Sequence, residues 1–335
     1  MALQTSGQIS LNEIHVEAGG TTGTEASFND TDIRGLISAS SASEMEMADW
    51  YGAANEVTLT SGGNVNGQAQ RKQITISSFI SSGGTLVIPS NIWIWSDSTS
   101  TPALTIDIPC TVKNSGKIIG RGGNGGTFYS STNGGGGGHA IKINSGVSGV
   151  TIINNSGAYI AGGGGGGSGL GGGGAGGGSG GRGSVGGTQT GGSLNAKGNP
   201  TSGFSSAYYS GQYPTGRGGG AGGGGGAYDD DGSDQGSGGG GGGGRQLPGS
   251  GGYGAGQQSI GVTWANGYSG YGNNQGGAGG SAGGTRYYKK GGGGGGWGAS
   301  GGNGYAGSAG SGGKAVNDSG NSYTLTNNGT VYGGT

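Results

Sequence analysis

Unbroken runs of glycine limit what the second half of this chain can fold into. Glycine accounts for 100 of the 335 residues, and 71 of these glycines lie between positions 161 and 314. An α-helix is disfavoured there by about 1 kcal/mol per glycine, and a glycine sheet lacks the side chains that fix strand register. Collagen needs glycine at every third position with abundant proline, but this chain has only six prolines. Segment 161–314 is therefore not a helix bundle, an ordinary sheet or collagen.

Two interpretations of this glycine body remain: a flexible linker, or an ordered bundle of extended chains. Ordering costs about 1–2 kcal/mol of backbone entropy per residue, so nearly every backbone N–H and C=O must find a partner. Threefold helices of the polyproline-II type direct all these groups outward and, without Cβ atoms, can hydrogen-bond side by side. We favour such polyglycine-II helices, one for each run, with two in the first run and a turn near residues 168–170. The runs are 162–178, 218–226, 238–244, 276–284 and 291–296.

The region before the glycine body has the alternating pattern of β-strands. Apolar and polar residues alternate over 73–77, 91–95 and 104–108, which predicts an all-β domain at 55–160. A strand, an Asn/Ser-Gly turn and a second strand recur at 112–120, 153–162 and 325–333. The third copy predicts that 315–335 returns beside the first two. The expected fold is thus mostly β and irregular: a small β domain carrying an inserted bundle of polyglycine-II helices with exposed loops.

The leader, residues 1–54, contains two short apolar-bearing stretches that Ser10 or Asp30 could cap as helical turns. So few apolar groups are not expected to build a core alone. We therefore expect a docking segment that folds against a partner protein, and a flexible tail is the alternative. The expected anchors are Leu11, Ile33, Trp50 and Tyr51.

Non-glycine loops separate the glycine runs and concentrate aromatic residues. They span 182–217, 227–237, 245–275, 285–290 and 297–309, and 161–314 holds ten of the 15 Tyr and two of the five Trp. Tyr, Ser, Gly and Asn together are typical of a binding loop, although such rings could instead cover the ends of the bundle. Candidate recognition residues are Tyr208, Tyr209, Tyr213, Tyr253, Trp264, Tyr268, Tyr271, Trp297 and Tyr305.

If each run crosses the body once, successive loops alternate between its two ends. Loops 182–217, 245–275 and 297–309 then share one end, which is rich in aromatic residues. Loops 227–237 and 285–290 share the other, where an acidic turn faces a basic one. We expect the aromatic end to make the recognition contacts.

Several kinds of chemistry lack candidate residues. The chain has one cysteine, Cys110, and two histidines, His15 and His139, without a nucleophile or carboxylate at a motif spacing. The acidic turn 229–234 resembles half a calcium loop but lacks its closing Glu. The 15 basic and 16 acidic residues give no nucleic-acid footprint, and no apolar run reaches the length of a membrane span. We expect no catalytic residue, metal site or cofactor, no nucleic-acid partner and no membrane insertion.

The strands, the Asn-Ser-Gly turn that leads into glycine at 153–167 and the aromatic loops resemble the receptor-recognising adhesins of T-even-like phage long tail fibres. The resemblance covers about 85–335 and implies a polyglycine-II body whose loops bind a host surface protein or glycan. Residues 8–52 instead resemble a short N-terminal module of assorted phage virion proteins. The resemblances imply a virion protein, assembled in the host cytoplasm, that contacts other tail or fibre proteins through its leader.

Two other functions are weighed against the adhesin. A structural virion protein without adhesive function is the main alternative. A glycan-cleaving tail protein would need paired carboxylates in a groove, and the sequence concentrates its acidic residues in one short turn.

Overall fold

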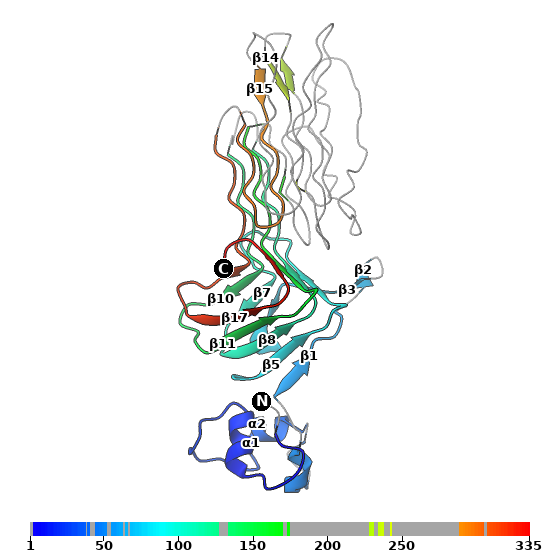
Figure 1. Cartoon of the computed structure of the whole chain (residues 1–335), viewed down its shortest axis with the longest axis vertical. Helices are drawn as coiled ribbons and strands as arrows, with labels where there is room; N and C mark the ends of the chain where they lie inside the picture. Colours follow the sequence, from blue (N-terminus) through cyan, green and yellow to red (C-terminus); the bar gives the residue numbers. More distant parts are fainter. Residues whose placement is uncertain are drawn as a thin grey trace.

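The chain is mostly β-structure with a few short helices, and its parts follow one another along the long axis of the molecule (Figure 1). An N-terminal module (residues 3–51) lies at one end, a β-solenoid in the middle, and extended glycine segments at the other end. The computed structural model describes residues 3–37, 39–40, 44–51, 55–62, 64–65, 68–126, 133–169, 173–174, 228–230, 234–237, 242, 288–304 and 307–335.

Parallel strands build the β-solenoid, and successive turns of the chain pass through the same three sheets in the same order. The first sheet contains β1 (Glu56–Thr58), β5 (Thr85–Ile88), β8 (Cys110–Asn114), β11 (Val150–Asn154) and β17 (Tyr323–Asn327). The second contains β3 (Gln68–Lys72), β6 (Trp93–Trp95), β9 (Lys117–Ile119), β12 (Tyr159–Ala161) and β18 (Thr330–Tyr332), with β2 (Asn64–Val65) as an antiparallel partner of β3. The third contains β4 (Ile74–Thr75), β7 (Leu104–Ile106), β10 (Ile141–Ile143) and β16 (Val316–Asn317), and the 3-10 turn η2 (Ile76–Ser78) follows β4.

Apolar side chains at equivalent positions of successive turns stack inside the solenoid. Leu86 pairs with Val112, which pairs with Ile152, and all three are fully buried. The second and third sheets contribute equivalent stacks through Ile94, Ile118 and Ile160 and through Leu104, Ile141 and Val316. Because strand side chains alternate between faces, every second residue enters this core. The alternation read from the sequence therefore predicts the inward face correctly.

A ladder of asparagine side chains also runs through the solenoid. Asn114 donates from Nδ2 to Oδ1 of Asn154 at 2.9 Å, and Asn154 donates in the same way to Asn327 at 2.8 Å. Asn114 and Asn154 are fully buried, so these amides depend on one another for hydrogen bonds. The ladder joins the return strand β17 to the two earlier copies of the repeat.

The predicted return of 315–335 beside the first two copies of the repeat is confirmed by the pairing of β11 with β17 and of β12 with β18. The register differs at one point. Aligning the repeats by sequence pairs Asn155 with Asn114, whereas in the structure Asn154 is the residue that pairs with Asn114. The reason is that the turn between β11 and β12 is longer than the turns that follow β8 and β17.

Two glycine-rich insertions leave the solenoid at the same corner, between a second-sheet strand and a third-sheet strand. The first runs from 120 to 140, between β9 and β10, and the second from 162 to 315, between β12 and β16. The region 55–160, expected to be β-structure throughout, thus also supplies glycine segments. We call the described segments of both insertions that pair with one another the glycine bundle; they are 120–126, 133–139, 162–169, 173–174, 242, 291–304 and 307–314.

Backbone hydrogen bonds within the glycine bundle advance three residues at a time. Gly120, Gly123 and Gly126 donate to the carbonyls of Ala161, Gly164 and Gly167 at 2.9, 2.8 and 2.8 Å. Gly134, Gly137 and Ala140 donate to Ser308, Ser311 and Lys314 at 2.9, 2.9 and 3.1 Å. A period of three differs from the period of two that governs strands. The segment 162–169 is buried along its whole length, because other backbones contact it on several sides.

The N-terminal module folds on itself, so the expectation that the leader builds no core alone is wrong. It contains α1 (Leu11–Glu17), α2 (Thr31–Gly35) and the 3-10 helix η1 (Met47–Trp50). Leu3, Ile14, Ala18, Ile33 and Trp50 form its buried cluster, separate from that of the solenoid. The large indole of Trp50 fills much of this small core and donates from Nε1 to the carbonyl of Ile33 at 3.0 Å.

The asparagine ladder predicts an asymmetric response to alanine. Asn154→Ala removes both ladder bonds and leaves buried polar atoms of Asn114 and Asn327 with fewer partners, which should lower the free energy of unfolding by about 2–3 kcal/mol. Asn155→Ala is the control. Within the described residues the Asn155 side chain donates to Ser115 Oγ alone, at 2.9 Å, so its removal should cost about 1 kcal/mol or less. Urea unfolding followed by tryptophan fluorescence measures both, and equal losses would contradict the ladder.

The three-residue packing predicts which glycines tolerate a methyl group. A Cβ on Gly163 would overlap the carbonyl of Arg121, so Gly163→Ala should destabilise the bundle by about 1–3 kcal/mol or more. A Cβ on Gly136 would meet its nearest neighbour, the Ser311 carbonyl, at 3.7 Å, so Gly136→Ala should be neutral or slightly stabilising. Thermal unfolding of both proteins is the measurement, and equal midpoints would argue against this packing.

Candidate receptor-binding and virion-docking sites

The start of α1 in the N-terminal module is fixed by a reciprocal cap. Ser10 Oγ accepts from the backbone N–H of Glu13 at 3.2 Å, and the Glu13 carboxylate accepts from the backbone N–H of Ser10 at 2.7 Å. Hydrogen bonds from the Ser10 hydroxyl and N–H lower the pKa of the Glu13 carboxyl. The cap therefore holds an ionised carboxylate on the exposed side of the first helical turn.

The predicted docking residues divide into two buried and two accessible side chains. Ile33 and Trp50 are fully buried in the module's own core, so they are not the partner-facing anchors that the sequence suggested. Leu11 is partly buried, and Tyr51 is exposed and donates from its hydroxyl to the carbonyl of Gly7. Phe28 was not selected from the sequence, yet it is exposed, and its ring lies 5.2 Å from that of Trp50 with the two planes tilted by 37°.

Trp297 occupies the junction between the glycine bundle and the solenoid. Its side chain is 1 % exposed and belongs to a buried cluster with Trp93, Ile119 and Ala161. The rings of Tyr159 and Tyr332 pack edge-on against it at 6.0 and 5.7 Å. The next residue, Gly298, turns the chain with a φ of +65° and donates to the carbonyl of Gly162 at 2.7 Å.

The expected position of Trp297 on an exposed recognition loop is therefore not what the structure shows. This ring seals the base of the bundle and is not accessible to a receptor. The other eight aromatic candidates lie outside the described residues: Tyr208, Tyr209, Tyr213, Tyr253, Trp264, Tyr268, Tyr271 and Tyr305.

Three short strands form a small sheet that joins loop 227–237, which carries the acidic turn, to loop 285–290, which carries the basic turn. β13 (Tyr228–Asp230) pairs antiparallel with β14 (Asp234–Ser237), which pairs parallel with β15 (Tyr288–Lys290). The prediction that loops 227–237 and 285–290 share an end is confirmed by this pairing. The small sheet, called here the tip sheet, lies at the end of the molecule opposite the N-terminal module (Figure 1).

His139 joins the ends of the two insertions where they return to the solenoid. Its Nδ1 accepts from the backbone N–H of Lys314 at 3.0 Å, directly before the paired strands β10 and β16. Burial, followed by the nearby charges of Lys314 and Lys142, lowers the pKa of this imidazole below its ordinary 6.5. The neutral ring is thus the form that holds the junction together.

Reactive side chains are not assembled in the described ranges. Burial, with a smaller contribution from Asp107, raises the pKa of the Cys110 thiol to about 12, so the reactive thiolate is scarce. Within those ranges, no three His, Cys, Asp or Glu side chains come together as they would around a metal ion. No helix in the part of the chain that the structure describes is long and apolar enough to cross a membrane.

Comparison with protein families gives a match over residues 55–237, which is more than half of the chain, to the phage tail fibre adhesin Gp38. The chain belongs to the Gp38 phage tail fibre adhesin family. No curated protein and no solved structure matches it significantly. The Gp38 match begins where the N-terminal module ends and continues through the solenoid into the glycine-rich region, as far as β14. As a Gp38 adhesin, the protein is a component of the phage particle and acts in receptor binding.

The His139 junction predicts a loss of stability in mild acid. The pKa of His139 is lower in the folded protein than the value of about 6.5 in the unfolded chain. The contribution of His139 to stability is therefore complete above about pH 6.5 and is lost as the pH falls through the folded-state pKa. The unfolding temperature should therefore fall between about pH 7.5 and about pH 5.5, a range in which carboxylates stay mostly ionised. His139→Asn keeps an acceptor that does not titrate, and its unfolding temperature should fall less over the same range. An identical fall in both proteins would exclude His139 as the cause.

Proposed function

We propose that this Gp38 adhesin attaches to the virion through its N-terminal module and carries its host-binding loops on a polyglycine-II bundle. The family match supports host binding, and the observation that carries the polyglycine-II bundle is the three-residue spacing of hydrogen bonds, since Gly120, Gly123 and Gly126 donate to carbonyls that are also three residues apart. Polyproline-II-type helices have three residues per turn and no internal hydrogen bonds. Runs of glycine along 162–296 provide further segments able to continue the same packing.

We infer that the receptor is bound by the aromatic loops 182–217 and 245–275 together with Tyr305. The rings proposed to contact the host are Tyr208, Tyr209, Tyr213, Tyr253, Trp264, Tyr268, Tyr271 and Tyr305. Tyr and Trp offer a large contact area at low entropic cost, which suits a host surface protein or glycan. The resemblance to adhesins of T-even-like long tail fibres supports the same assignment.

The tip sheet is the competing receptor surface within the same function. It lies at the end opposite the N-terminal module, and its strands include Tyr228 and Tyr288. An adhesin anchored by its N-terminal module would turn this end toward the host. In the sequence, the acidic turn 229–234 and the basic turn 286–290 suit mutual neutralisation more than recognition, so we assign recognition to the aromatic loops and test both surfaces.

The attachment proposed here requires no catalysis, metal or cofactor. The alternative weighed from the sequence, a structural virion protein whose loops contact only other virion proteins, does not agree with membership of an adhesin family. Binding of the purified protein to host cells separates the two functions, because only an adhesin should occupy receptors and block infection.

Alanine substitutions in the aromatic loops test the receptor surface. Tyr208→Ala, Trp264→Ala and Tyr268→Ala should each weaken inhibition of phage adsorption roughly thirtyfold or more, which corresponds to about 2 kcal/mol for an aromatic anchor. Tyr228→Ala and Tyr288→Ala are matched controls in the tip sheet and should retain full inhibition. The measurement is the concentration of purified protein that halves adsorption, with thermal unfolding as the check on folding.

Two results would contradict the assignment. Unchanged inhibition by all three loop variants would remove the aromatic loops from the receptor surface. A loss confined to the tip variants would move recognition to the tip sheet while leaving the protein an adhesin.

A further inference from the structure

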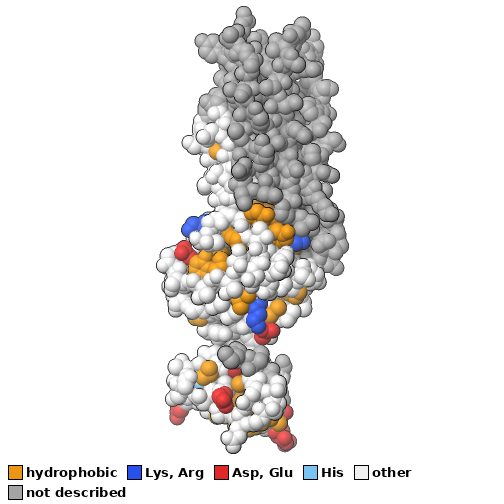
Figure 2. Space-filling view, in the orientation of Figure 1, with side chains coloured by type: hydrophobic (Ala, Val, Ile, Leu, Met, Phe, Trp, Pro, Cys, Tyr) orange, Lys and Arg blue, Asp and Glu red, His pale blue; other side chains and the backbone are white. Residues whose placement is uncertain are grey.

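The N-terminal module carries almost no positive charge. Eight of the 16 Asp and Glu residues of the chain, but only one of its 15 Lys and Arg residues, lie in 1–54. That residue, Arg34, is 5 % exposed and donates to the carbonyls of Phe28 and Ser40. Figure 2 shows red acidic side chains and no blue ones on this face of the module. Its described surface is therefore acidic, while residues 55–335 carry an excess of basic residues.

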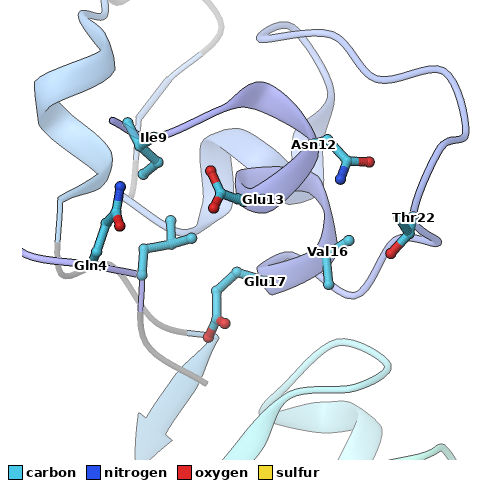
Figure 3. Close-up of a pocket in the computed structure, with 8 residues that line it drawn as sticks. Gln4, Ile9, Asn12, Glu13, Val16, Glu17 and Thr22 are labelled. Carbon is cyan, nitrogen blue, oxygen red and sulfur yellow. The ribbon is translucent and has the colours of Figure 1, made fainter. Parts of the chain in front are cut away.

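A groove of about 380 Å³ lies on this acidic module, beside α1. Leu3, Ile9 and Val16 give it apolar walls, and the carboxylates of Glu13 and Glu17, one helical turn apart, line it as well. Glu13 lies between Ile9 and Val16 (Figure 3). An apolar side chain could thus enter the groove with a cation close to each carboxylate.

The groove combines accessible apolar surface with a fixed shape. Val16 is 42 % exposed, and with Phe28 and Tyr51 it makes three of the four large hydrophobic side chains that are exposed in the described chain. The Ser10 cap fixes Glu13, and Glu17 accepts from the backbone N–H of Asn55 at 3.1 Å. Exposed apolar groups gathered on one small module, with charges in fixed positions, are typical of a protein-binding surface.

We propose that this groove binds a short segment of another virion protein, in which an aliphatic side chain is flanked by Lys or Arg. The inference rests on the proposed attachment of the module to the virion and names the surface and the chemistry of that contact. The aliphatic group packs between Ile9 and Val16, and the flanking cations pair with Glu13 and Glu17. Charge complementarity selects the segment, since the module has no exposed Lys or Arg among its described residues to repel it.

Incorporation into virions tests the groove with the full-length protein. Val16→Ser removes an apolar wall, and the double variant Glu13→Gln/Glu17→Gln removes both charges while keeping hydrogen-bond acceptors for the cap and for Asn55. The amount of adhesin per particle should fall about tenfold or more for each, because the contact loses an apolar anchor or its charge pairing. Val57→Ser is the apolar control, as Val57 is 37 % exposed on β1, and Glu25→Gln/Glu44→Gln is the charge-matched control outside the groove.

The controls and the host-binding assay separate the possible failures. Controls should incorporate normally, and purified groove variants should unfold at the wild-type temperature and block adsorption to host cells as well as the wild-type protein does. Normal incorporation of the groove variants into virions, or an equal loss of incorporation in the charge-matched control, would overturn the proposed role of the groove in docking. Failure of the wild-type protein to block adsorption would overturn host binding and leave the docking result standing.

A photoreactive benzoylphenylalanine at position 16 identifies the occupant. In assembled virions it should cross-link to a peptide of another virion protein that contains Lys or Arg next to an aliphatic residue. Cross-linking to a second copy of this chain, or to a peptide without a cation, would overturn the proposed partner.

Discussion

Close approach of backbones that have no Cβ atoms is the constraint on which the glycine bundle depends. Within the bundle, a carbonyl oxygen commonly occupies the space where a side chain would begin, as the Arg121 carbonyl does at Gly163 and the Asn124 carbonyl at Gly166. Each span therefore obtains its stability from hydrogen bonds to neighbouring spans rather than from buried side chains. Gly163 illustrates this, because its N–H donates to Gly138 and its carbonyl accepts from Gly313.

Such a bundle needs a starting register, and the solenoid provides it. Glycine segments have no side chains to prevent slippage by one repeat. The first bonded pair of the bundle, Gly120 to Ala161, directly follows the paired strands β9 and β12, so the strand register passes straight into the glycine segments. The asparagine ladder and the apolar stacks fix that register below the junction, and Trp297 closes the junction itself.

The sequence predicts those features that depend on local chemistry. Alternation over 104–108 identifies a strand with its inward face, and the Asn/Ser-Gly turns identify the copy at the C-terminus that pairs as β17 and β18. The order of strands in three parallel sheets is not local, since residues far apart in the chain form each pair. The shift from Asn155 to Asn154 has the same origin, because the length of one turn changes the register without changing the repeat.

The candidate sites were less predictable, because exposure depends on packing. Trp50, Ile33 and Trp297 are apolar residues in polar or glycine-rich surroundings, a pattern that also fits exposed anchors. In a small module, however, a single indole can replace several aliphatic side chains, and Trp50 does so in the buried cluster that it forms with Ile14 and Ile33. The groove beside α1 escaped prediction because it combines Leu3, Ile9 and residues of α1, which only the fold brings together.

The proposed function assigns attachment and recognition to separate parts of the molecule. Most hydrogen bonds between the described spans of the glycine bundle join backbone atoms, and side chains such as those of Ser168, Asn133 and His139 accept a few more. Loops held on a rigid frame can change their side chains while the frame keeps its geometry. The N-terminal module has its own core and charge, which makes its contacts independent of those loops. If the N-terminal module docks and the loops bind the host, as proposed, substitutions in the loops change the receptor without changing the contact with the particle.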